Sequence, residues 1–314
     1  MSIHPDDIQR VKGQGFLRNK GTDCFNARIL TTNGNLSTAQ IRAIAEAADK
    51  FGCGRVQFTS RMTVELPGIP YEQIPEFQAF LGEHGLYTGG TGPKVRPVVS
   101  CKGTTCQYGL YDTFALSEKI HERFYLGYHT VKLPHKFKIA CGGCPNNCVK
   151  PDINDLGIIG QLVPNVDTDS CNGCKKCQVA VACPMKAVSV EDGEIEINED
   201  VCNNCGRCVG TCPFDVIEDG VPGFRITIGG RWGKKVNRGQ ALNKIFTTEE
   251  ELLDTVEKAI LFFREQGKTG ERFADTIERL GFEYCEKEIL GDAIMARKQE
   301  ILDAQLHLVG GATC

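Results

Sequence analysis

The sequence predicts an α+β fold of mixed sheets and helices that is interrupted by a cysteine-rich insert. In the first 90 residues, apolar positions alternate between strand and helix periodicity. Cysteine density rises abruptly near residue 165 and falls again after about 221. Strand and helix periodicity then resumes toward the C-terminus, so we expect the surrounding fold to continue past the insert.

Length, charge and cysteine usage limit the class of protein. The 314 residues can form two or three domains, and the net charge of −4 argues against nucleic acid as a partner. No apolar run approaches the roughly 18 residues needed to cross a bilayer. The first seven residues lack the apolar core of a signal peptide. Many of the 17 cysteines are separated by two residues, which favours metal ligation over disulfides. We therefore expect a cytoplasmic metalloprotein with no membrane partner.

The first predicted domain spans residues 1–92 and is a small α+β unit. Its first 20 residues are predicted to be a polar lead-in. Ser37 and Gln40 form a capping-box pattern that begins a helix, and Arg61 lies in a strand-like run. The elements expected after the lead-in are a strand over 25–30, a helix over 37–52, one or two strands over 56–66, and a helix over 71–85.

A second domain is predicted from residues 93–164 together with 222–314. Thr248 and the acidic residues after it favour a helix start, and Gly267 favours its end. Three strands are expected: one that ends at Cys101, one over 155–162 and one over 224–228. The expected helices cover 108–126, 248–264, 271–280 and 291–307.

The insert, residues 165–221, contains two similar cysteine runs. The second, Cys202-x2-Cys205-x2-Cys208-x3-Cys212-Pro, matches the bacterial ferredoxin spacing, and the first has two more residues before its last cysteine. In that motif the last cysteine of each run ligates the other cluster, and zinc is the alternative metal. We expect two [4Fe–4S] clusters, one held by Cys171, Cys174, Cys177 and Cys212, and the other by Cys202, Cys205, Cys208 and Cys183.

A third group of cysteines lies beside a run of lysines. Residues 132–148 contain three lysines and three cysteines, and a further cysteine pair lies upstream. Thiolates bind soft metals and ammonium groups bind anions, so the stretch suits a metallocofactor that receives an oxyanion. A structural zinc site is the alternative, although zinc sites do not require flanking cations. Four thiolates are available for a third iron–sulfur cluster: Cys101, Cys106, Cys144 and Cys148.

Four cations are predicted to converge on one anionic ligand. Arg61 lies in a strand-like run, where an inward-facing arginine is costly unless it is paired. Arg96 directly precedes an apolar segment and the first cysteine of this group. Lys136 and Lys138 flank Phe137, so both point to the same face of an extended segment.

Taken together, these motifs resemble a known family, the sirohaem-containing sulfite and nitrite reductases, and above all the catalytic subunits of anaerobic sulfite reductases, which also carry a two-cluster ferredoxin insert. The resemblance extends from about residue 13 to 290. The family usually places five residues between its first two cysteines, whereas this chain has four. The motifs are Thr59-Ser-Arg61, Arg96, Leu133-Pro-x-Lys136-x-Lys138, Gly143-Cys144-Pro-Asn-x-Cys148 and Asp155-Leu-Gly157-Ile-Ile-Gly160.

The resemblance implies one sirohaem and three [4Fe–4S] clusters. Cys148 would bridge the third cluster to the sirohaem iron. Arg28, Lys102 and Lys132 are further candidates to bind sirohaem carboxylates. The four converging cations would bind the oxyanion and supply protons. The five cysteines outside the three ligand sets are expected to be buried or free thiols: Cys24, Cys53, Cys141, Cys285 and Cys314.

The expected activity is the six-electron reduction of sulfite to sulfide, with electrons entering through the insert. Reduction of nitrite to ammonium is the alternative at the same site. Two hypotheses from other classes are a polyferredoxin electron carrier and a zinc-stabilised interaction module. No GxGxxG nucleotide motif is apparent, so a partner subunit or a soluble ferredoxin is expected to donate the electrons, in a homo- or hetero-oligomer.

Overall fold

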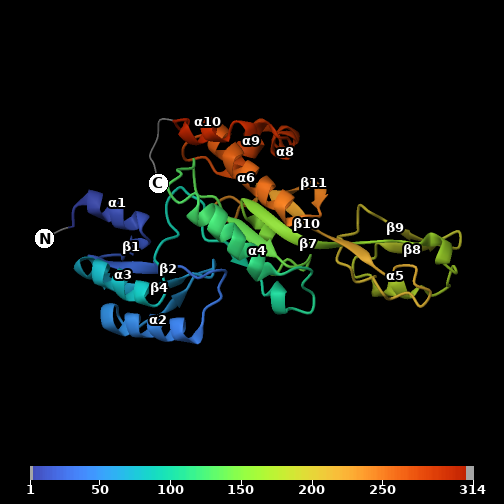
Figure 1. The fold of residues 1–314 in the computed structure, drawn as a ribbon, viewed down its shortest axis with the longest axis horizontal. Helices are drawn as coiled ribbons and strands as arrows, with labels where there is room; N and C mark the ends of the chain where they lie inside the picture. Colours follow the sequence, from blue (N-terminus) through green and yellow to red (C-terminus); the bar gives the residue numbers. More distant parts are fainter. Residues whose placement is uncertain (1–2, 309–314) are drawn as a thin grey trace.

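The computed structural model describes residues 3–308. It shows an N-terminal α+β unit, a central sheet with helices packed on it, and an insert that extends from one end of that sheet (Figure 1). Within residues 3–308, no helix is long and apolar enough to span a membrane. Cys314 lies outside the described residues.

The N-terminal unit is a four-stranded antiparallel sheet with strand order β1-β2-β4-β3. The predicted capping box is confirmed, because the Ser37 hydroxyl accepts from the Gln40 amide and the Gln40 side chain accepts from the Ser37 amide. The elements are α1 (Pro5–Gly13), β1 (Phe16–Arg18), β2 (Cys24–Ile29), α2 (Thr38–Phe51), β3 (Gln57–Phe58), β4 (Val64–Pro70), η1 (Tyr71–Gln73) and α3 (Ile74–Glu83).

Two predictions for this unit were wrong. The supposed polar lead-in forms α1 and β1, and it buries Val11 and Phe16 in the core of the unit. The polar sequence of α1 concealed it, since a helix that buries only Val11 has little apolar periodicity. Arg61 lies in the turn between β3 and β4 rather than in a strand. The Thr59 hydroxyl accepts from the backbone amides of Arg61 and Thr63 and so organises this turn.

The central sheet has five strands in the order β11-β10-β7-β6-β5. The pairs β5–β6 and β6–β7 are parallel, and the pairs β7–β10 and β10–β11 are antiparallel. The strands are β5 (Val99–Ser100), β6 (Ile139–Gly142), β7 (Leu156–Pro164), β10 (Gly220–Ile228) and β11 (Gln240–Phe246).

The helices of the central domain are shorter and more numerous than predicted. The predicted helix 108–126 begins only at Thr113, where the Asp112 side chain caps two amides, and it ends in a π-helical turn. Gly281, with φ of 90°, separates two helices near residue 280. The elements are η2 (Gly103–Thr105), α4 (Thr113–Ile120), η3 (His121–Leu126), η4 (Pro151–Ile153), α6 (Glu249–Gln266), α7 (Phe273–Leu280), α8 (Phe282–Leu290), α9 (Ala293–Ala296) and α10 (Lys298–Asp303).

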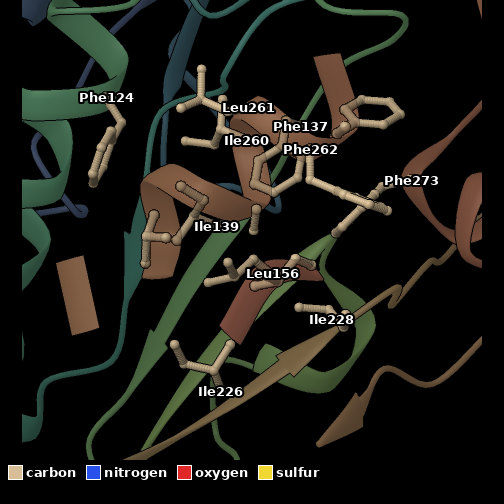
Figure 2. Close-up of a cluster of buried hydrophobic side chains, with 14 of the residues drawn as sticks. Phe124, Phe137, Ile139, Leu156, Ile226, Ile228, Ile260, Leu261, Phe262 and Phe273 are labelled. Carbon is tan, nitrogen blue, oxygen red and sulfur yellow. The ribbon is translucent and has the colours of Figure 1, made fainter. Parts of the chain in front are cut away.

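One apolar core joins the central sheet to these helices (Figure 2). The predicted core face of α6 is confirmed, because Leu252, Val256, Ile260 and Phe263 are all fully buried. Phe137 is fully buried too, with its ring centroid 5.9 Å from that of Phe263 and 5.3 Å from that of Phe273. This packing fixes the backbone on either side of Phe137.

The insert, residues 165–219, connects β7 to β10. These two strands pair over nine residues each, from Leu156 opposite Ile228 to Pro164 opposite Gly220. The insert has a small core of its own, which includes Val179, Ile195 and Ile217. Its elements are η5 (Thr168–Ser170), α5 (Gln178–Ala182), β8 (Val188–Glu191) and β9 (Glu194–Ile197).

Candidate functional site

A basic cavity lies between the N-terminal unit and the central sheet. Its volume is about 350 Å³, and its wall contains six basic side chains and no acidic one. The turn between β3 and β4 also contributes the hydroxyl residues Thr59, Ser60 and Thr63. All four cations that were predicted to converge are among the six, and the structure therefore brings them together. The basic residues of this cation cavity are Lys12, Arg28, Arg61, Arg96, Lys136 and Lys138.

Neutral oxygens hold the Arg61 side chain. Its Nη1 donates to Asn154 Oδ1 at 2.7 Å, and its Nη2 donates to the Pro97 carbonyl at 2.8 Å. Its Nε is buried and has no hydrogen-bond partner among the described residues. Burial lowers the pKa of the guanidinium to about 10, so Arg61 remains a cation at neutral pH. These contacts fix the group without neutralising its charge.

Arg96 and Arg28 share one acceptor but differ in charge balance. Both donate to the Gly90 carbonyl. Arg28 also pairs with Glu65 at 2.6 Å, which compensates its charge. Burial lowers the pKa of Arg96 to about 10, and its buried Nε has no partner within the described chain. Arg96 therefore contributes more uncompensated positive charge to the cation cavity than Arg28 does.

Lys136 and Lys138 both line the cation cavity, as their spacing around Phe137 predicted. The backbone amide of Lys138 donates to Asp155 Oδ2 at 2.9 Å. Burial and, after it, the nearby Arg61 charge lower the pKa of the Lys138 ammonium to about 8, while Asp155 opposes the change. Such a lysine is charged at neutral pH but releases its proton more readily than an exposed one.

Two basic residues suggested by the resemblance lie outside the wall of the cation cavity, and one basic residue in the wall was not predicted. Lys102 and Lys132 are exposed and lie outside the wall of the cation cavity. The resemblance proposed them for sirohaem carboxylates rather than for this wall, and that role stays a prediction. Lys12 was missed because the helix that carries it was not predicted. Pro5, at the first position of that helix, and the acidic pair after it were the available signal.

Four thiols gather near the carboxyl ends of the parallel strands β5 and β6. The Gly143 amide donates to the Cys101 sulfur at 3.1 Å, which links the two cysteine loops. Burial raises the pKa of the Cys144 thiol, and the neighbouring Cys101, Cys148 and Cys106 thiols raise it further. The structure thus brings the predicted set of Cys101, Cys106, Cys144 and Cys148 together.

Two further thiol sets lie in the insert. One small cavity is lined by Cys183 together with the first three cysteines of the second run, and another by Cys212 together with the first three of the first run. The last cysteine of each run therefore lies with the other run, as the ferredoxin pattern predicted. Within residues 3–308, no three His, Cys, Asp or Glu side chains are arranged to hold a single metal ion.

The cysteines outside these sets differ in exposure. Cys141 and Cys285 are fully buried in the main core, where burial raises the pKa of each thiol. Cys24 is half-buried and Cys53 is exposed. Within the part of the chain that the structure describes, these four are free thiols.

A larger cavity has a different character. It measures about 630 Å³ and lies between the insert and β11. Apolar residues such as Val163 and Leu242 form much of its wall, and its few charges, Glu199, Arg225 and Lys244, are of both signs. The smaller cation cavity is therefore the better candidate for an anion site.

Two family models match the chain. The model described as nitrite and sulphite reductase 4Fe-4S domain matches residues 91–294, and the nitrite/sulfite reductase ferredoxin-like half domain matches residues 17–84. The chain belongs to the nitrite and sulfite reductase family. It is therefore an oxidoreductase, and the family expected from the sequence motifs is confirmed.

Individual relatives agree with this assignment. The chain is 32% identical over 246 residues to the coenzyme F420-dependent sulfite reductase of Methanocaldococcus jannaschii, spanning 77% of this chain but only 38% of that protein. It is 29% identical to one subunit of the anaerobic sulfite reductase of Salmonella typhimurium, over 84% of this chain and 82% of that relative. The fold is similar to the crystal structure of dissimilatory sulfite reductase I, with a TM-score of 0.68, 23% identity, and coverage of 85% of this chain and 69% of that one. The mixed α/β fold of the family is thereby confirmed.

Proposed function

We propose that this protein catalyses the six-electron reduction of sulfite to sulfide at the cation cavity. The observation that carries the proposal is a wall with six basic side chains and no acidic one, in a fold that also gathers three sets of four thiols. Such a concentration of positive charge suits a small oxyanion, because fixed cations stabilise the charge that it carries. The names of the sulfite reductase relatives support sulfite as the substrate.

The residues present fit the cofactors that the family implies. Four thiols suit a [4Fe–4S] cluster, and Cys148, whose side chain is exposed, would be the thiolate shared with the sirohaem iron. The buried, unpartnered Nε groups of Arg61 and Arg96 fit an anionic occupant of the cation cavity. Arg28 and Lys12, which line the cation cavity, would face sirohaem carboxylates, and Lys102 and Lys132, which lie outside its wall, stay further candidates for that role. When bound, sirohaem and its cluster supply electrons to the anion.

The chain's own residues bind the anion and handle protons. Arg61 and Arg96 are fixed cations that attract the oxyanion and orient it. Lys138 holds a proton on Nζ at neutral pH, and its lowered pKa of about 8 suits it to donate that proton as oxygen leaves as water. Lys136, on the same face, adds positive charge that stabilises the developing negative charge.

Electrons are proposed to enter through residues 165–221, which act as a two-cluster ferredoxin domain between the two parts of the catalytic domain, 93–164 and 222–314. The second cysteine run packs directly on the catalytic domain: the Leu162 amide donates to the Asn204 carbonyl at 2.8 Å, and the Arg207 guanidinium lies 5.1 Å from the centroid of the Tyr108 ring. Tyr108 is two residues from Cys106 along the chain, so this contact supports a route from the insert toward the third thiol set. The donor is a partner subunit or a soluble ferredoxin, in a homo- or hetero-oligomer.

Anaerobic purification followed by iron, sulfide and optical analysis tests this proposal. Three clusters and one sirohaem correspond to about 13 irons per chain. Turnover is then measured with a chemical reductant, comparing kcat/KM for sulfite and nitrite. A higher value for nitrite would establish the alternative substrate. Clusters without sirohaem would indicate a polyferredoxin, and zinc without sulfide would indicate an interaction module.

A further inference from the structure

The short segment of Asn154 and Asp155 connects the cation cavity to the loop of Cys144 and Cys148. We infer that Asn154 and Asp155 are positioning residues, which hold Arg61 and Lys138 in the geometry that binds the substrate anion. The inference rests on the proposed function, since it assigns these two residues to the same reaction. Neither side chain lines the cation cavity, so both act through the cations.

Asn154 links Arg61 to the cysteine loop. Its side chain is buried, with 6% of the residue exposed. Its Oδ1 accepts from Arg61 Nη1 at 2.7 Å, while its Nδ2 donates to the Lys150 carbonyl at 2.9 Å. Lys150, with φ of 51°, lies two residues after Cys148. The amide group of Asn154 therefore makes the position of Arg61 depend on the path of the cysteine loop.

Asp155 fixes the segment that carries Lys138. It is fully buried, and its Oδ2 accepts from the Lys138 backbone amide at 2.9 Å. The Leu156 amide returns a hydrogen bond of 3.0 Å to the Lys138 carbonyl. Both carboxylate oxygens accept from Arg272 Nη2 at 2.9 Å. A buried carboxylate needs such pairing, and this one is thereby held rigidly behind the lysine.

Asp155 also supplies the negative charge that faces Lys138. Burial, Arg61, Arg272 and Lys136 all lower the pKa of Lys138, whereas Asp155 raises it. Across the cation cavity, Lys12, Arg28 and Arg96 add positive charge, with Glu65 paired to Arg28 behind its wall. Loss of the Asp155 charge should therefore favour the neutral amine, and Lys138 should lose its proton at a lower pH.

The first experiment is the pH profile of sulfite kcat/KM for the Asp155→Asn holoenzyme with a chemical reductant. We expect the alkaline limb of the profile to move to lower pH by about one unit, which is at the lower end of the pKa shifts that a close charge causes. Glu257→Gln is the matched control, since Glu257 is likewise buried, accepts from Tyr128 at 2.6 Å and pairs with Lys298, but none of its partners lines the cation cavity. Glu257→Gln should keep the wild-type limb even where it lowers stability.

The second experiment is a double-mutant cycle between Asn154 and Arg61. The affinity for sulfite is measured from the optical change of bound sirohaem, without turnover. Asn154→Leu should weaken binding about tenfold in the wild-type background and have almost no effect in the Arg61→Ala background, because Asn154 acts through Arg61. A general structural defect would instead give the same loss in both backgrounds.

The outcomes separate the inference from the proposed function. If the wild-type holoenzyme does not reduce sulfite, the proposed function fails and the inference fails with it. If the wild type reduces sulfite, an unchanged alkaline limb in Asp155→Asn overturns the role of Asp155, and additive losses overturn that of Asn154. Should Asp155→Asn fail to fold, the cycle at Asn154 decides the inference alone.

Discussion

At the scale of single residues, the reactivity of this site depends on how each cation is compensated. Arg28 is paired with Glu65, whereas Arg61 is held only by neutral oxygens. The sequence indicates which residue types converge but not which of them have counter-charges. That distinction arises from neighbours far away in the chain, such as Asn154, which lies 93 residues from Arg61.

Lys138 should determine the alkaline limit of sulfite turnover. Its ammonium, with a pKa of about 8, is present below that pH and is lost as pH rises through it. Lys138→Arg replaces it with a guanidinium that stays charged, so any remaining activity should persist to higher pH. The measurement is kcat/KM for sulfite between pH 6 and 10, with Lys136→Arg as the control. The same limit in wild type and Lys138→Arg would contradict this role.

Substrate cations and cofactor cations should respond differently to removal. Lys136→Ala, Lys138→Ala, Arg61→Ala and Arg96→Ala should each lower sulfite turnover by about 10²–10³, because each removes a fixed charge aimed at the reacting anion. These variants should retain sirohaem, whereas Arg28→Ala should reduce its content. Optical spectra and turnover of the same preparations provide the comparison. Full sirohaem with unaltered kcat/KM in both lysine variants would refute their assignment.

At the scale of elements, strong local signals predicted the structure and weak ones did not. The capping box at Ser37 and the apolar face of α6 were correct because local sequence determines both. The first helix was missed because Val11 is its only buried residue. Arg61 was assigned to a strand because its neighbours are β-formers, but Met62, with φ of 59°, turns the chain there.

The segment that carries the two lysines should depend on Phe137 for its stability. Phe137→Ala removes a fully buried ring from contact with two other phenylalanines, which should cost about 3–5 kcal/mol in the free energy of unfolding. Phe58→Ala is the control, since Phe58 is 79% exposed and should change stability by about 0.5 kcal/mol or less. Urea unfolding of both variants measures the difference. Equal losses would show that the core does not anchor this segment.

At the scale of the whole molecule, the sequence predicted the insert and the grouping of its thiols more completely than the cation cavity. Fixed cysteine spacing specifies the thiol sets, whereas the cation cavity draws its wall from five separated stretches of chain. The net charge of the chain is also a poor guide to the charge around the site, because residues 165–221 contain 11 acidic and 4 basic residues. The net charge of −4 therefore conceals a basic remainder around the site.

The two kinds of thiol should be separable by substitution. Cys148→Ser should impair the sirohaem spectrum and sulfite turnover with any reductant, because a hydroxyl replaces a thiolate poorly. Cys205→Ser should leave the sirohaem spectrum intact and slow only turnover driven by the physiological donor. Optical spectra and turnover with both kinds of reductant distinguish the two. Unchanged donor-driven turnover in Cys205→Ser would exclude a relay through that thiol set.

The pairing of β7 with β10 makes the insert a detachable module. Pro164 and Gly220 are opposite each other in the last register pair, so the two ends left by removing the insert would lie side by side. Deleting residues 165–219 and closing the ribbon with an Asn-Gly turn would preserve the nine-residue pairing and leave the cation cavity untouched. The shortened enzyme should accept electrons from a small chemical reductant and be unresponsive to its natural donor. If the insert relays electrons as proposed, the same junction should accept another electron-transfer module, and the source of electrons could then be exchanged while the cation cavity stays unchanged.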